Sequence, residues 1–456
     1  VRQVRVVKGR VRFRATCAPR FDYARRGHSA EAVARGVLFT PQGGASPPLR
    51  LLSDAPLALE GGDAHADFVL ECGATATFVL EPVNDGSPIA QDIRALGEDA
   101  HRETAQFWRA WIGRCRYDGR WREMVHRSAL ALKLLTSRRH GSIVAAPSFG
   151  FPNEPGGERN WDYRYTWLRD AAFTTYAFMR LGYTHEARAF MAWLEDRICE
   201  ADEKGSLEVM YRIDGSPIEG EEHLHHLEGY RGSLPIRLGS SNHDQEQLDV
   251  YGELMDSVYL YDKYGAPISY DLWRGLRGLI ELVCERWREP DAGIWEVRGG
   301  KRHFLFSRVM CWVAVDRGVR LALKRSRPAP VDRWRATRDE IYESVFEEFW
   351  DERKGAFVQA AGSDALDAAA LMMPLVKFIS PTDPKWSSTM AAIERELAED
   401  SLVYRYRVGE AFSDELSGTE GTFSICSFWF IEALSRAGEL EKARYLFEKM
   451  LSYASP

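Results

Sequence analysis

The pattern of hydrophobic and polar positions changes character early in the chain. Up to about residue 85, apolar and polar residues alternate over short runs, as in 11–15, 68–71 and 76–80. Alternation over such lengths is typical of half-buried β-strands, and the Pro- and Gly-rich run at 41–48 has the composition of a loop. This part of the chain is therefore expected to form a β-sandwich, or the surviving part of one.

From about residue 92 the apolar positions recur with a helical period. We expect a connecting helix around 104–111 and then helices near 121–136, 168–181, 185–200, 244–263, 269–287, 307–324, 329–349, 364–377, 384–399, 421–436 and 439–452. Two of them end at a glycine, Gly182 and Gly438, and a short turn and a further helix follow each. Helical hairpins in this number fit either an α/α-toroid or an α-solenoid.

Composition narrows the class of protein. The chain has 456 residues, of which 45% are hydrophobic and 28% charged, as in ordinary globular proteins. A net charge of −7 and a pI near 6.0 give no reason to expect a nucleic-acid partner. No run approaches the roughly 18 apolar residues of a membrane span, so no membrane association is expected.

The cysteines indicate a compartment. Seven Cys are scattered along the chain without a Cys-x-x-Cys pair. This distribution favours buried free thiols over disulfides or a zinc site, and therefore a reducing, cytoplasmic location. The first residue is not Met and already lies in an alternating pattern, so the N-terminus is interpreted as cut.

The run from Asn160 to Asp170 has the strongest chemical character in the chain. It interleaves four aromatic residues with two Arg and two Asp, directly before a predicted helix. Flat rings beside charged hydrogen-bonding groups suit a polyhydroxylated ring such as a sugar. At its end, Arg169 and Asp170 either grip sugar hydroxyls or simply occupy the first turn of the helix, where an acidic residue is favoured.

Glu296 is the candidate general acid. An acid for glycoside cleavage must hold its proton near neutral pH, which requires apolar surroundings, and Ile294, Trp295 and Val297 could provide them. The alternative is a surface Glu paired with Arg298.

Two further clusters carry polar chemistry. Glu420 precedes Gly-Thr at a predicted helix start, where it either caps the helix or lines a cavity together with the aromatic and Arg residues upstream. The His-rich run 221–226 lacks the spacing of a zinc protease and is interpreted as a solvated loop, so no metal site is expected.

Together these motifs resemble glycoside hydrolase family 15, and within it the bacterial branch of glucoamylase-like proteins and trehalases. The resemblance extends over essentially the whole chain, through the segments 119–123, 145–147, 156–170, 229–233, 247–253, 293–296, 312–317 and 420–423. It implies a β-sandwich followed by an (α/α)6 barrel. The domains expected are a partial sandwich at 1–90, a helical linker at 91–118 and a catalytic barrel at 119–456.

The resemblance also implies roles for individual residues. Its chemistry is inverting hydrolysis of a terminal α-linked glucose, with trehalose and α-glucan ends as alternative substrates and with no cofactor. Glu296 would be the general acid. The residues implied in substrate binding are Tyr165, Trp167, Arg169, Asp170, Trp295, Arg405 and Glu420.

Two departures from the family pattern stand out. In the family the general base is a Glu that follows a Ser-x-x-x-Pro segment like 452–456 and precedes the last barrel helix. The resemblance therefore implies that the base, this helix and part of the sandwich lie outside these residues. In addition, Ser240, Ser241, Asn242 and His243 stand where relatives carry small residues.

Other readings of the sequence stay open. A sugar-binding barrel without catalytic activity fits the same motifs, and only the base distinguishes it from an exo-acting α-glucosidase. An α-solenoid interaction module fits the hairpins but leaves the aromatic-acidic segments without a role. The pattern does not separate a monomer from a homo-oligomer.

Overall fold

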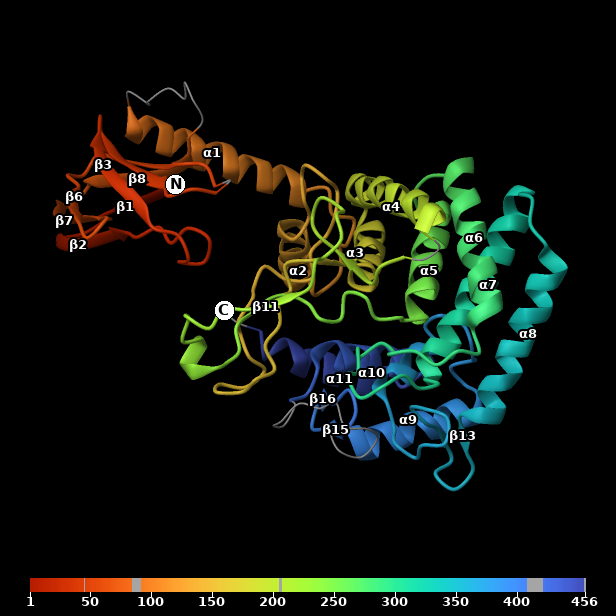
Figure 1. Ribbon diagram of the computed structural model, residues 1–456. Coiled ribbons are helices and arrows are strands. Elements are labelled where there is room, and N and C mark those ends of the chain that lie inside the picture. Colours follow the sequence, from red (N-terminus) through yellow and green to blue (C-terminus); the bar gives the residue numbers. More distant parts are fainter. Residues whose placement is uncertain (45, 84–91, 205–206, 408–420, 455–456) are drawn as a thin grey trace. The chain divides into compact units, whose positions relative to one another are not determined.

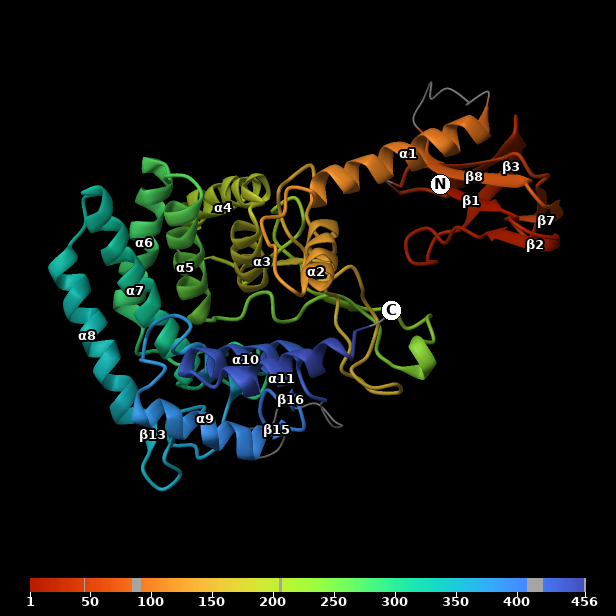
Figure 2. The ribbon, with the colours of Figure 1, turned by 180° about the vertical axis from the view of Figure 1, so that it is seen from behind.

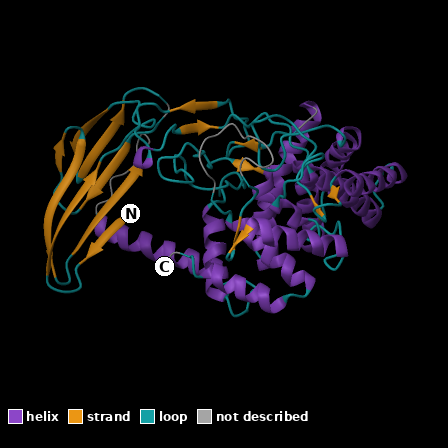
Figure 3. Cartoon of the chain, turned by 90° about the horizontal axis from the view of Figure 1, so that it is seen from below, coloured by secondary structure: helices purple, strands orange, loops and turns teal. Residues whose placement is uncertain are grey.

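The computed structural model describes residues 1–44, 46–83, 92–204, 207–407 and 421–454. The chain divides into two compact units, Val1–Arg114 and Cys115–Pro456. Strands gather in the first unit and helices in the second (Figure 3). The three-part division at 1–90, 91–118 and 119–456 stays a prediction.

The first unit contains two antiparallel sheets. Five strands pair in the order β1-β8-β5-β4-β3 and three in the order β2-β7-β6 (Figure 1). Their bounds are β1 Arg2–Arg5, β2 Arg10–Cys17, β3 His28–Val33, β4 Gly36–Pro41, β5 Leu49–Ser53, β6 Ala58–Glu60, β7 Asp63–Glu71 and β8 Thr75–Pro82. The three runs predicted from alternation coincide with β2, β7 and β8.

Alternation places the two faces of the larger sheet against different partners. Leu51 of β5 packs into a core with Phe39 of β4 and Ala64 of β7, so this core joins the two sheets. The next residue, Leu52, points the other way and packs with Val79 and Ile93, the first residue of helix α1 (Ile93–Ile112). One sheet thus serves two apolar contacts, because successive side chains alternate across a strand.

The second unit is helical. Its α-helices are α2 Arg122–Leu134, α3 Leu168–Leu181, α4 Thr184–Lys204, α5 Asp249–Tyr264, α6 Tyr270–Arg286, α7 Leu305–Arg325, α8 Val331–Glu348, α9 Pro384–Leu397, α10 Ser424–Ala437 and α11 Leu440–Leu451. Short strand pairs and the 3₁₀ helices η1 (Tyr230–Gly232) and η2 (Ala368–Met372) lie in the connections. The paired short strands are β9 Thr166–Trp167, β10 Met210–Tyr211, β11 Glu221–His223, β12 Arg237–Gly239, β13 Trp350–Asp351, β14 Ala356–Phe357, β15 Ala398–Glu399 and β16 Leu402–Val403.

These helices form two layers. Helices α3, α5 and α7 pack on one another in succession, and the series continues through η2 to α10. Outside this series, α4 packs on α3, α6 packs on α5 and α7, α8 packs on α7, and α11 packs on α10 (Figures 1 and 2). Burial separates the layers: α7 is buried on nearly all sides, whereas α8 buries one stripe that includes Trp334 and Ile341. The predicted order of a β-sandwich followed by an (α/α)6 barrel is confirmed.

The predicted hairpin glycines are also confirmed. Gly182 and Gly438 adopt left-handed conformations with φ of 93° and 95°, and each ends its helix two residues before the next begins. A residue with a Cβ would be strained there. The helix expected at 364–377 is wrong, because this segment contains only η2. Pro374 removes a helical donor, and Lys377 adopts a positive φ of 66°.

No described helix combines the length and the apolar character needed to cross a bilayer. All seven Cys are free: Cys311 and Cys426 are buried, whereas Cys72 and Cys199 are exposed. The expectation of buried thiols therefore applies to only part of the set.

Asp291 joins the starts of two inner helices. Its Oδ2 accepts hydrogen bonds from Leu248 N, at the N-terminus of α5, over 2.8 Å and from Ser307 Oγ of α7 over 2.7 Å. The side chain is buried, and its Oδ1 has no partner among the described residues. Burial, with a smaller contribution from the charge of Asp249, raises the pKa of Asp291 from 3.8 to about 7.

This raised pKa predicts a pH dependence of stability. The folded protein holds the Asp291 proton more tightly than the unfolded chain, so the stabilisation is complete below the ordinary pKa and is lost as pH rises toward 7. The shift is worth on the order of 4 kcal/mol. Asp291→Asn keeps an acceptor but cannot ionise. Its free energy of unfolding, relative to the unsubstituted protein, should therefore increase as pH rises from 4 to 8.

Urea denaturation of both proteins at several pH values in this range checks the expectation. The control is Asp364→Asn, because Asp364 is exposed in a loop. Parallel stability curves for the Asp291→Asn protein and the unsubstituted protein would contradict the prediction.

Candidate active site

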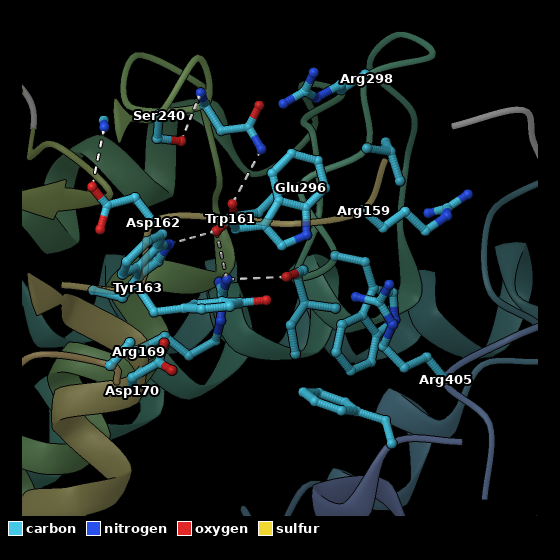
Figure 4. A pocket seen from close by; sticks show the side chains of 18 of the residues that line it. Arg159, Trp161, Asp162, Tyr163, Arg169, Asp170, Ser240, Glu296, Arg298 and Arg405 are labelled. Carbon is cyan, nitrogen blue, oxygen red and sulfur yellow. Dashed lines mark hydrogen bonds and ion pairs between the residues drawn. The ribbon is translucent and has the colours of Figure 1, made fainter. Parts of the chain in front are cut away.

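A pocket in the helical unit gathers most of the residues singled out from the sequence. Its cavity volume is about 210 Å³. Three parts of the chain supply most of its lining: the aromatic run before α3, the loop that carries Glu296, and residues 405–406 after β16 together with Phe423, which precedes α10 (Figure 4). The lining residues are Ala145, Arg159, Trp161, Asp162, Tyr163, Trp167, Arg169, Asp170, Gly239, Ser240, Asn242, Ile294, Trp295, Glu296, Val297, Arg298, Arg405, Tyr406 and Phe423.

The aromatic run is held in place by short backbone pairing. Strands β9 and β10 are antiparallel, with Trp167 opposite Met210. Helix α3 begins directly after Trp167, which puts Arg169 and Asp170 in its first turn. Side chains at the end of the strand and the start of the helix therefore reach the same pocket.

Glu296 sits on a tight turn with an unusual backbone. Its φ is 55°, in the left-handed region that a residue with a Cβ rarely occupies. Gly293 is also left-handed, and a Cβ there would lie 2.7 Å from the ring of Phe304, so only glycine fits. Non-glycine residues in this region cluster at functional sites.

Three donors surround the Glu296 carboxyl group (Figure 4). Trp167 Nε1 donates to Oε1 over 2.9 Å, and Arg169 Nη2 donates to the same oxygen over 3.2 Å. Asn242 Nδ2 donates to Oε2 over 3.3 Å. The pairing of Glu296 with Arg298 that the sequence left open is not the arrangement found, because Arg298 forms its ion pair with Glu221.

Arg169 is buried, and the two terminal nitrogens of its guanidinium donate hydrogen bonds to different groups. Its Nη1 donates to Asp249 Oδ2 over 2.6 Å and to Gln247 Oε1 over 3.1 Å. Its Nη2 also donates to the carbonyl of Ile294 over 3.0 Å. Burial acts to lower the pKa of Arg169, but the charges of Asp249 and Glu296 outweigh it and raise the pKa above its ordinary value. Arg169 is therefore a fixed cation that links α3, α5 and the Glu296 loop.

Asp170 keeps exposed surface toward the pocket, although protein atoms crowd around it. This crowding removes hydration and raises the pKa of Asp170, while the charge of Arg169 opposes the rise and that of Glu296 adds to it. An acidic group in this position can accept hydrogen bonds from the hydroxyl groups of a ligand.

Trp295 and Arg405 form another wall. Trp295 Nε1 donates to both carboxyl oxygens of Asp367, over 3.0 and 2.9 Å. The Arg405 guanidinium lies 4.9 Å from the centre of the Trp295 ring and 5.6 Å from that of Phe423. Burial raises the pKa of Asp367. The contacts lock the indole of Trp295 at the pocket surface.

The structure brings together six of the residues chosen from the sequence: Trp167, Arg169, Asp170, Trp295, Glu296 and Arg405. Among the described residues that line the pocket, Tyr163 is present and Tyr165 is not. Glu420 lies outside the described residues. The binding roles of all these residues stay predictions.

Several pocket residues were not selected from the sequence. Trp161 and Tyr163 belong to the aromatic run, so its composition could have indicated them. Asn242 lies in the segment 240–243 that departs from the family pattern. The partner of Arg169, Asp249, lies 80 positions away from it, and nothing local in the sequence indicates that the two meet.

Comparison with known proteins identifies the family. The pattern described as "Glycosyl hydrolases family 15" matches residues 119–455. The trehalase of Mycobacterium tuberculosis is 41% identical over the whole of this chain, which spans 67% of that relative's length. The trehalase of Mycolicibacterium smegmatis is 40% identical, again over the whole chain and over 69% of its own length.

Solved structures share the fold. A bacterial glucoamylase crystallised with acarbose aligns with a TM-score of 0.64 at 12% identity, over 88% of this chain and 65% of its own. A glycosidase variant bearing a Glu-to-Ala substitution aligns with a TM-score of 0.55 at 20% identity, over 73% of this chain and 83% of its own. With the family pattern, the relatives and the pocket in agreement, this chain belongs to the glycosyl hydrolases of family 15 and is a trehalase-like or glucoamylase-like glycoside hydrolase.

Proposed function

We propose that this protein is an inverting, exo-acting hydrolase of terminal α-linked glucose, with trehalose as its preferred substrate. The observation that carries the proposal is the Glu296 carboxyl group, held by Trp167 and Arg169 in a pocket walled by aromatic rings. In this proposal Glu296 is the general acid that protonates the oxygen of the departing sugar.

The contacts of Glu296 indicate which oxygen carries the acidic proton. Oε1 already accepts from Trp167 Nε1 and Arg169 Nη2, so a proton there would oppose two donors. The proton therefore belongs on Oε2, where the Asn242 amide is the neighbour. The Asn242 amide can donate from its NH₂ group to an ionised Glu296 carboxylate, and its oxygen can accept from a protonated Glu296 carboxyl group.

The size and walls of the pocket suit a short substrate. Its volume of about 210 Å³ lies below the 300–1,000 Å³ typical of sites for drug-sized ligands, as expected for the end of a glycan or a disaccharide. The rings of Trp161, Tyr163, Trp167 and Trp295 offer flat apolar surfaces. Arg169, Asp170 and Arg405 offer charged hydrogen-bonding partners for hydroxyl groups.

The choice of trehalose rests on two supports. The relatives that are 41% and 40% identical over the whole chain are trehalases. In addition, the pocket wall at Trp161 is braced: the guanidinium groups of Arg237 and Arg298 lie 4.8 and 4.9 Å from its ring centre, and Glu221 pairs with both. A wall held in place by these contacts favours one compact second sugar over a variable chain.

We propose further that the general base is not among the described residues that line the pocket. Three of the described lining residues are acidic: Asp162, Asp170 and Glu296. Asp162 is buried, and both of its carboxyl oxygens accept hydrogen bonds from Arg164 over 2.8 Å. We therefore assign it a structural role and not that of the base. Asp170 is assigned to substrate hydroxyls. The base of an inverting enzyme stands about 6.5–9.5 Å from the acid, with a water between it and the sugar.

Glu296→Gln tests the general acid in the full-length protein. Gln keeps an acceptor for Trp167 and Arg169 but has no acidic proton. We expect kcat for trehalose to fall by about 10²–10⁴-fold while the Kd for the sugar changes little. Steady-state kinetics and titration calorimetry provide the two numbers. The matched control is Glu219→Gln, because Glu219 is exposed. Retention of most of the activity by Glu296→Gln would refute the assignment.

Titration calorimetry of the protein with trehalose, maltose and isomaltose tests the substrate. We expect saturable heat that is strongest for trehalose. Binding of maltose in preference to trehalose would refute the substrate. Binding of trehalose without its hydrolysis would favour a non-catalytic sugar-binding barrel.

A further inference from the structure

Asp249 is a buried acidic residue that contacts Arg169, the neighbour of the candidate general acid. It is the first residue of α5, is fully buried, and lies 2.6 Å from Arg169 Nη1. It is not among the residues that line the pocket. The hydrogen-bonded connection between Asp249 and Glu296 runs through the guanidinium of Arg169.

The geometry divides the guanidinium of Arg169 between two carboxyl groups. One nitrogen, Nη1, faces Asp249 and Gln247, and the other, Nη2, faces the Ile294 carbonyl and Glu296. A planar guanidinium fixed at one edge has its other edge fixed as well. The ion pair of Arg169 with Asp249, at 2.6 Å, is shorter than its ion pair with Glu296, at 3.2 Å. Arg169 therefore interacts more strongly with Asp249 than with Glu296.

Three further carboxyl groups lie near Arg169 and Asp249. Asp170 follows Arg169 on α3, Glu253 lies one turn along α5 from Asp249, and Asp291 faces Asp249 from the loop before Glu296. Burial, reinforced by Asp249, raises the pKa of Glu253 well above its ordinary value, and it also raises that of Asp291. Asp249 is the carboxyl group placed to balance Arg169, because it contacts the guanidinium over 2.6 Å.

A neighbouring unbalanced cation would oppose the role proposed for Glu296. A general acid must be protonated when the substrate binds, and a cation within about 4 Å favours the ionised carboxylate. Arg169 can hold Glu296 in position without ionising it only if its charge is neutralised elsewhere.

We propose that Asp249 is a positioning residue for the reaction: it anchors and neutralises Arg169, so that Arg169 orients Glu296 through Oε1 while Glu296 keeps its proton. This inference rests on the proposed role of Glu296 as general acid. It assigns to α5 a part in catalysis although Asp249 touches no substrate.

The test uses two substitutions with opposite expected signs in the full-length protein. Asp249→Asn removes the balancing charge, and the alkaline limb of the kcat/KM profile for trehalose should move down by about one pH unit. Activity should recover toward that of the unsubstituted enzyme at acidic pH. Gln247→Glu adds a carboxylate of the same shape at the same Nη1, so the limb should move up. If Asp249→Asn does not fold, the direction of the shift in Gln247→Glu still tests the inference.

A matched control separates this role from a structural one. Asp256 also lies on α5 and pairs with an arginine, Arg317, over 2.6 Å. Asp256→Asn should leave the limb where it is. An equal loss of kcat/KM at every pH in Asp249→Asn, or a limb that moves in the same direction in both Asp249→Asn and Gln247→Glu, overturns the inference.

A second readout does not depend on hydrolysis. Carbodiimide couples amines to protonated carboxyl groups, and mass spectrometry of the peptide that contains Glu296 measures the labelled fraction at each pH. Labelling in Asp249→Asn should fall off at a pH about one unit lower than in the unsubstituted protein, and in Gln247→Glu at a higher pH. If the protein hydrolyses no α-glucoside, the proposed function fails, but the labelling still decides whether Asp249 controls the charge at Glu296.

Discussion

The site depends on one buried cation. Taking a guanidinium out of water costs several kcal/mol unless partners replace its hydration, and Arg169 finds four acceptors in Asp249, Gln247, Ile294 and Glu296. These acceptors come from the segment that opens α5 and from the loop after α6. The need to satisfy Arg169 therefore fixes α3, α5 and the Glu296 loop relative to one another, and the pocket is the space that this arrangement leaves.

The sequence predicts the fold well where a local pattern determines the structure. Helical periodicity locates α3 at 168–181 with the same bounds as the structure, and Gly182 ends it because a left-handed residue is required there. The pattern fails at 364–377, where apolar residues suggest a helix. Asp367 instead accepts from Ala369 N, Trp295 and Gln359, and the chain follows these tertiary bonds. Periodicity cannot register a side chain that competes with the helix for its backbone donors.

The candidate site shows the same limit. Residue chemistry and family resemblance indicate Glu296, Arg169 and Trp295, which the structure places in one pocket. They do not indicate Asn242, which reaches Glu296 across 54 positions. Tyr165 precedes the two-residue strand β9 and is not among the described residues that line the pocket, and its role in binding stays a prediction.

The residues around Glu296 and Arg169 lower the stability of the fold. Glu296 adopts a strained backbone, and Asp249, Glu253 and Asp291 each leave one oxygen without a partner among the described residues. Such groups destabilise a fold by a few kcal/mol each. The helices that carry or contact them compensate through packing, since α7 is buried along almost its whole length. Because the loop that carries Glu296 and Asp291 is bonded to the N-terminal ends of α3, α5 and α7, the carboxyl group of Glu296 can be held in a costly but fixed position, as a preorganised acid requires.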